Sequence, residues 1–203
     1  GADSLSASVW PSMPLLTNVG LDGQADVAAL NAILGDETSM TNHIKAIAKW
    51  VSDGALKGIT LDYQGVDAGL TSRFSDFVAD LSAALHAAGA QLAVRVPTPS
   101  QVGGVWDAGS YDWAALGQNA DAIRFAAPAD PRDCVAGGAL DGLLAWAVSQ
   151  APRQKLAAEF SALSLDLSGQ GAKAIPVSQA LLPLSQLAIQ GDKIEILPGQ
   201  VVT

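Results

Sequence analysis

Apolar residues recur along the chain at two spacings, one typical of helices and the other of strands. Apolar side chains three and four residues apart predict helices at residues 26–34, 39–52, 71–88, 110–118, 140–150 and 178–187. Short apolar runs between them predict strands at residues 9–18, 58–66, 91–96, 121–127, 155–165 and 193–197. Strands and helices therefore alternate, which is the pattern of an α/β fold with a parallel sheet and helical crossovers.

The strand at residues 58–66 has one apolar and one polar face, because successive strand side chains point to opposite sides. The apolar face carries Ile59, Leu61 and Tyr63, and the polar face carries Thr60, Asp62 and Gln64. Helices cover both faces of a parallel sheet, so neither face is freely exposed to water. We therefore expect this polar row to line a cavity or a pocket, or to be fully hydrogen-bonded.

The composition is that of a folded protein with an acidic surface. Of the 203 residues, 49% are apolar and 15% are charged, which excludes a disordered chain and suits one domain over residues 1–203. The formal net charge of −9 argues against a nucleic-acid partner, because phosphate binding needs a surplus of Lys and Arg. We expect no membrane span, since no run of about 18 apolar residues occurs.

Few residues could hold a metal ion or a cofactor. Cys134 is the only cysteine, which leaves no intrachain disulfide and no cysteine-built zinc site. His43 and His86 are the only histidines, and both lie in predicted helices without ligand spacing. The glycines at 103–104 mark a loop without the strand-to-helix setting of a phosphate loop. We therefore expect no cofactor and no metal.

Residues 58–66 resemble the fourth strand of glycoside hydrolase family 18, the chitinase-like barrels. That strand carries the motif D-x-x-D-x-D-x-E, usually after a glycine and often running into Gly-Val, as at Gly65 and Val66 here. Further segments are similar to the family's third strand, fifth strand, sixth strand and approach to the seventh. They are residues 11–18, 74–96, 111–125 and 146–159. The bacterial spore- and cell-wall-associated branch is the most similar.

The resemblance implies a (β/α)8 TIM-barrel-like fold that is incomplete or reduced. Strands three to seven are recognisable between residues 9 and 165, whereas two earlier strands have no room before Val9. A complete barrel takes about 250 residues. We therefore expect a fragment of a longer chain, a reduced barrel, or a partner chain that covers the gap.

The resemblance fails at the residues that the family uses for catalysis. The first two Asp of the motif fall at Lys57 and Thr60, the third is kept as Asp62, and the Glu is replaced by Gln64. In the family, that Glu donates a proton while the substrate's own acetamido oxygen attacks the anomeric carbon. A Gln has the reach of Glu but no carboxyl proton. The family's Met-x-Tyr-Asp after the sixth strand is also replaced, by residues 126–130.

Three interpretations of the polar row stay open. In the first, the domain is an active hydrolase, and Asp62 or a loop carboxylate such as Asp130 supplies the proton. In the second, Asp62 and Gln64 hydrogen-bond a glycan at the carboxyl mouth of the barrel, where sites of such barrels lie. In the third, the row is structural, and Asp62 is held in a buried ion pair.

Four further residues belong to these interpretations. Asn18 and Trp106 are candidate ligand-binding residues, and Trp106 follows the family's fifth strand in a Gly-rich loop where its ring could stack on a sugar. Arg95 and Arg124 lie in otherwise apolar strands. We expect both to point to the same interior as Asp62 and one of them to pair with it.

The resemblance thus implies a catalytically inactive chitinase-like domain that acts as a glycan-binding, structural or interaction module. The alternative is an active hydrolase of N-acetylglucosamine-containing glycans, such as chitin or peptidoglycan. The expected partners are a glycan, another protein, or other domains of a longer chain. The family suggests an extracellular or cell-surface location, although the sequence opens without a signal peptide and fits a cytoplasmic protein, a mature secreted one or a fragment equally.

Overall fold

The computed structural model describes residues 13–161, 164–167 and 173–180. The strand predicted at 193–197 and the later part of the helix predicted at 178–187 lie outside the described residues. A helix does begin at Val177.

The chain forms two compact units. The first comprises Gly1–Phe125 and Leu143–Ala158, and the second comprises Ala126–Gly142 and Glu159–Thr203. A single domain over residues 1–203 therefore stays a prediction.

A five-stranded sheet forms the centre of the fold. Its strands are β1 (Leu15–Thr17), β2 (Gly58–Asp62), β3 (Gln91–Arg95), β6 (Ala122–Ala126) and β7 (Leu156–Glu159). They follow one another across the sheet in the order β1-β2-β3-β6-β7. The pairs β1–β2, β2–β3 and β3–β6 are parallel, as the alternation of strands and helices predicted.

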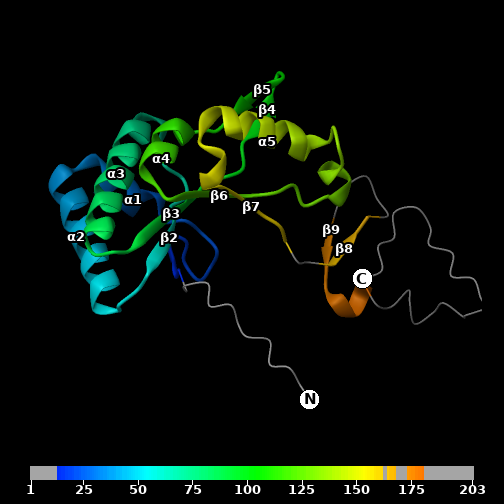
Figure 1. Ribbon diagram of the computed structural model, residues 1–203. Helices are drawn as coiled ribbons and strands as arrows, with labels where there is room; N and C mark the ends of the chain where they lie inside the picture. The colour runs from blue at the N-terminus through cyan, green and yellow to red at the C-terminus, as the bar shows by residue number, and fades with distance from the viewer. Residues whose placement is uncertain (1–12, 162–163, 168–172, 181–203) are drawn as a thin grey trace, which may run out of the picture. The chain divides into compact units, whose positions relative to one another are not determined.

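Helices connect these strands. The α-helices are α1 (Val27–Gly35), α2 (Glu37–Asp53), α3 (Thr71–Ala87), α4 (Trp113–Asn119) and α5 (Ala139–Gln150). Short 3-10 helices are η1 (Ala68–Leu70), η2 (Pro131–Cys134) and η3 (Arg153–Lys155). In Figure 1, α1, α2 and α3 lie together on one side of β2 and β3. None of the described helices is both long and apolar enough to cross a membrane.

The core lies between α3 and the sheet. The predicted apolar stripe of α3 is fully buried, and it consists of Phe74, Phe77, Val78, Leu81 and Leu85. Ile59 and Leu61 of β2 and Leu92 and Val94 of β3 are equally buried. The alternating pattern of β2 thus directs its apolar face into the helix layer, which leaves the polar face on the other side of the sheet.

The described residues also form two antiparallel hairpins, one in each unit. β4 (Ser100–Val102) pairs with β5 (Val105–Asp107), and β8 (Ser164–Asp166) pairs with β9 (Lys173–Ile175). The predicted loop at residues 103–104 is confirmed, as the connection between β4 and β5. Gly103 and Gly104 both have positive φ, at 59° and 82°, which is the requirement of a two-residue hairpin turn.

Candidate functional site

The polar row lies at the carboxyl edge of the sheet, where four parallel strands end side by side. Thr17 of β1 pairs in register with Asp62 of β2. Arg95 of β3 pairs in register with Arg124 of β6. Asp62 and Arg95 are neighbours one step beyond the last register pair of β2 with β3. These four side chains therefore share one level of the sheet, at the end where parallel α/β proteins place their sites.

Asp62 forms an ion pair with Arg95, with its Oδ2 3.1 Å from Nη1 of the arginine. The side chain of Asp62 is only 8% exposed, whereas that of Arg95 is 36% exposed. The carboxylate is therefore buried, and the arginine side chain is partly exposed. A buried carboxylate needs such a partner, because removing a lone charge from water costs several kcal/mol.

Gln64 bridges the two oxygens of the same carboxylate. Its Nε2 lies 3.3 Å from Oδ1 and 3.3 Å from Oδ2 of Asp62. The amide nitrogen is the donor in both contacts, and the side chain as a whole is half-buried.

Arg124 lies on the same face as Asp62 but contacts a different residue. Its Nη1 is 3.5 Å from Oγ1 of Thr60, which is 3% exposed. At that distance the hydrogen bond is weak. The structure thus brings both predicted arginines to the polar row and assigns the ion pair with Asp62 to Arg95.

The opposite face of the same segment is anchored in the helix layer by Tyr63. Its hydroxyl lies 2.5 Å from Nε2 of His43 on α2, and its ring stacks on Phe77 of α3 at 5.9 Å between centroids. Burial raises the pKa of Tyr63 to about 12 and lowers the pKa of His43. Tyr111 donates a hydrogen bond of 2.8 Å to the carbonyl of Tyr63. Sequence spacing gave no signal for these contacts, which join separate elements.

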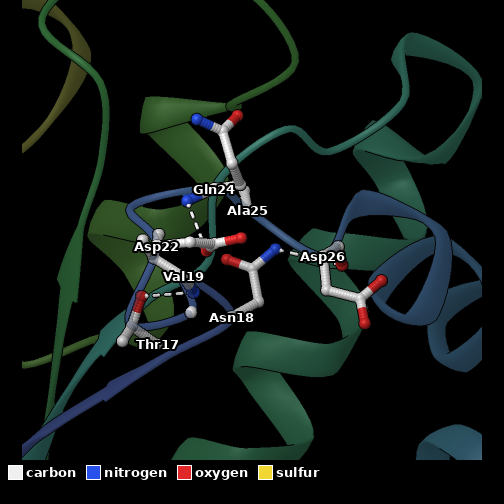
Figure 2. Close-up of a pocket in the computed structure, with 8 residues that line it drawn as sticks. Thr17, Asn18, Val19, Asp22, Gln24, Ala25 and Asp26 are labelled. Atoms are coloured by element: carbon white, nitrogen blue, oxygen red, sulfur yellow. Dashed lines mark hydrogen bonds between the residues drawn. The ribbon is translucent and has the colours of Figure 1, made fainter.

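A shallow, open pocket of about 530 Å³ adjoins the polar row in the loop between β1 and α1. Residues 17–20, 22 and 24–26 line it (Figure 2). The loop is shaped by its own side chains, because Thr17 Oγ1 accepts from the backbone N–H of Val19 and Asp22 Oδ1 accepts from that of Gln24, each at 3.0 Å. Hydroxyl, amide and carboxylate groups therefore surround a space that is open to solvent.

Asn18 connects this pocket to the polar row. Its Oδ1 accepts from the backbone N–H of Gln64, and its Nδ2 donates to the backbone carbonyl of Gln64, each at 2.9 Å. The sequence selected Asn18 as a ligand-binding residue but gave no indication of this contact, which spans 46 residues.

Trp106 lies on β5 and is half-buried. Its ring centroid is 6.2 Å from that of Trp146 on α5, and Trp146 packs edge-on against Trp113 at 4.9 Å. Within the described residues no hydrogen bond or ring contact joins Trp106 to the polar row. Its role in stacking on a ligand stays a prediction.

Asp130 belongs to the second unit and pairs with Arg132. Hydrogen bonds from the Arg132 side chain and backbone lower the pKa of Asp130, which makes its carboxyl a poorer proton donor near neutral pH. In the part of the chain that the structure describes, no three His, Cys, Asp or Glu side chains group in a way that could hold a metal ion.

Comparisons with known proteins point to one fold. No protein-family model matches the sequence, and no curated protein matches it. A candidate sporulation-specific glycosylase from Bacillus subtilis superposes with a TM-score of 0.70 at 20% identity, covering 87% of this chain and 61% of that chain. A chitinase from Chromobacterium violaceum ATCC 12472 superposes with a TM-score of 0.70 at 23% identity, covering 87% of this chain and 57% of that chain. A class V chitinase from Nicotiana tobaccum superposes with a TM-score of 0.55 at 20% identity, covering 72% of this chain and 47% of that chain.

The chain has a chitinase-like fold. The predicted α/β architecture related to the TIM barrel is therefore confirmed. The chain spans between 47% and 61% of the length of these three solved structures.

Proposed function

We propose that this domain is a catalytically inactive chitinase-like module that binds glycan chains at the carboxyl edge of its sheet. The proposal is carried by Gln64, which stands at the motif position of the family's proton-donating Glu. Its Nε2 lies 3.3 Å from both oxygens of Asp62. An amide held in this way can hydrogen-bond a sugar but has no proton to give to a glycosidic oxygen.

The rest of the polar row does not replace the lost acid. The oxygens of Asp62 accept hydrogen bonds from Arg95 and Gln64, so this carboxylate acts as an acceptor. Thr60 stands where the family has its second Asp, and a hydroxyl cannot supply the negative charge that helps orient the substrate's acetamido group. Asp130 has a lowered pKa. Turnover therefore lacks both the proton donor and part of the positioning machinery.

Glycan binding is supported by the groups that remain. Sugar hydroxyls and acetamido groups both donate and accept hydrogen bonds. Gln64 has a carbonyl oxygen that can accept, and the Arg95 side chain, whose guanidinium can donate, is 36% exposed. The class V chitinase from Nicotiana tobaccum is a Glu-to-Gln variant in complex with NAG4. That neighbour is an example of the same fold carrying such a substitution together with a bound oligosaccharide.

The test combines calorimetry with an activity assay. We expect NAG4 to bind the intact chain, Gln64→Ala to weaken that binding, and fluorogenic chitooligosaccharides to show no turnover. Turnover that Asp62→Ala abolishes would instead establish the hydrolase alternative. If neither NAG4 nor peptidoglycan fragments bind, the domain is a structural or interaction module.

The proposal includes an extracellular or cell-surface location, with other domains or a protein partner beside this one. The names of the neighbours, a chitinase and a sporulation-specific glycosylase, support a setting in which polymeric glycans are present. Fractionation of cells that produce the chain, followed by immunoblotting, tests this location.

A further inference from the structure

The side chain of Asn18 extends the ladder between β1 and β2 by one more step. The last register pair of these strands is Thr17 with Asp62, and Asn18 follows directly. Its carboxamide then bonds both backbone groups of Gln64, accepting from N–H and donating to C=O at 2.9 Å each. A carboxamide has the same donor and acceptor as a peptide group, so it can satisfy a strand end as another strand residue would.

We infer that Asn18 is a positioning residue, which fixes the backbone of Gln64 and thereby aims its side-chain amide at Asp62. This role takes the place of the direct ligand contact that the sequence suggested. Nδ2 of Asn18 has a further, longer contact of 3.4 Å with the carbonyl of Asp26. The polar atoms of Asn18 are therefore engaged with backbone groups, although the residue lines the pocket in Figure 2.

The residue after Gln64 strengthens this inference. Gly65 has a φ of +76°, and a Cβ built on it would lie 2.5 Å from Cγ2 of Val27. The backbone is thus left-handed and closely packed at Gly65, immediately after the residue that Asn18 holds. Gln64 contacts Asp62 through its side chain and Asn18 through its backbone, and the left-handed Gly65 follows it.

The first test reads the position of the Gln64 amide without any glycan. In ¹⁵N NMR spectra of the full chain, the Nε2 protons of Gln64 are assigned by their loss in Gln64→Glu. In Asn18→Ala we expect their exchange with solvent to become about tenfold faster and their shifts to move toward those of an unstructured Gln. Unchanged exchange and shifts in a folded Asn18→Ala protein would overturn the inference.

A matched control is Gln24→Ala, because Gln24 lines the same pocket and its side chain points away from Asn18 (Figure 2). We expect it to leave the Gln64 signals unchanged. If Asn18→Ala does not fold, Asn18→Asp keeps the acceptor for the N–H of Gln64 and removes the donor to its carbonyl. We expect Asn18→Asp to shift the same signals by a smaller amount, and no shift would again overturn the inference.

The second test uses NAG4, and only this part rests on the proposed function. We expect Asn18→Ala to weaken NAG4 binding about tenfold. If the wild-type chain does not bind NAG4 while the Gln64 signals still move in Asn18→Ala, the proposed function fails and the positioning role stands. If NAG4 binds equally well to the wild type and to Asn18→Ala, the placement of Gln64 by Asn18 does not contribute to glycan binding, and that part of the inference is overturned.

Discussion

The carboxylate of Asp62 and the guanidinium of Arg95 pair across two neighbouring parallel strands, with 3.1 Å between Oδ2 and Nη1. Each residue is the last of its strand, so the pair closes the β2–β3 edge at the end where a barrel keeps its active site. Gln64 contacts the same carboxylate. The one carboxylate retained from the catalytic motif is therefore engaged by an arginine and an amide.

Replacing Asp62 by Asn should destabilise the fold. The change removes the Asp62 carboxylate from its ion pair with Arg95, and removing one partner of a buried pair costs about 3–5 kcal/mol. Because the Arg95 side chain is 36% exposed, water can solvate part of this charge. We therefore expect a smaller loss of about 1–3 kcal/mol in the free energy of unfolding, measured by urea denaturation.

A double-mutant cycle separates the ion pair from other effects of the substitution. Arg95→Gln and the double variant complete the cycle with Asp62→Asn, and we expect a coupling of at least about 0.5 kcal/mol. Thr60→Val provides the comparison, since its contact with Arg124 is 3.5 Å long and should contribute less than about 1 kcal/mol. A coupling of zero would mean that the pair adds nothing to stability.

Gln64→Glu should not restore catalysis. The new carboxyl group would regain a proton to donate, but Thr60 still replaces the second Asp of the motif and residues 126–130 still lack the family's Tyr. The acetamido group that acts as nucleophile would remain poorly oriented. We expect fluorogenic chitooligosaccharides to stay at background turnover, and strong rescue would show that Gln64 alone accounts for the lost activity.

His43 should make the stability of the fold depend on pH below neutrality. Burial lowers its pKa in the folded protein from the ordinary 6.5, so between the two values the unfolded chain binds more protons. The free energy of unfolding is therefore highest, as far as His43 is concerned, above about pH 6.5. It falls as the pH drops from there toward the lowered pKa of the folded protein. Urea denaturation at several pH values from about 5 to 7.5 measures the slope.

Two variants show whether burial causes this slope. His43→Gln removes the titrating group, and we expect it to flatten the dependence in the window. Tyr63→Phe removes the hydrogen bond to Nε2 of His43. The imidazole stays packed between two aromatic rings, that of the new Phe and that of Phe77. This variant should keep the slope, because burial and not the hydrogen bond lowers the pKa. Equal slopes in wild type and His43→Gln would contradict the assignment.

The sequence was informative wherever periodicity or a motif carried the signal. The buried stripe of α3 and the two faces of β2 follow from side-chain spacing, and Asp62 was singled out because its motif neighbours are changed. The choice of Arg95 over Arg124 depends on strand register, which spacing within one strand does not contain. The contact of Asn18 with Gln64 joins residues 46 positions apart, so no local pattern could reveal it.

Gly65→Ala should destabilise the protein more than an alanine at another left-handed glycine. Gly65 and Gly89 have similar φ values of 76° and 71°, but only Gly65 has a side chain, Val27, in the way of a new Cβ. We expect about 1 kcal/mol of lost stability for Gly89→Ala, from the backbone alone, and about 2–4 kcal/mol for Gly65→Ala, from backbone and clash together. Combining Gly65→Ala with Val27→Ala should reduce the extra loss, because the methyl group at 2.5 Å is then removed. If the two glycine variants unfold at the same urea concentration, the backbone at Gly65 adapts to a side chain and does not fix the position of Gln64.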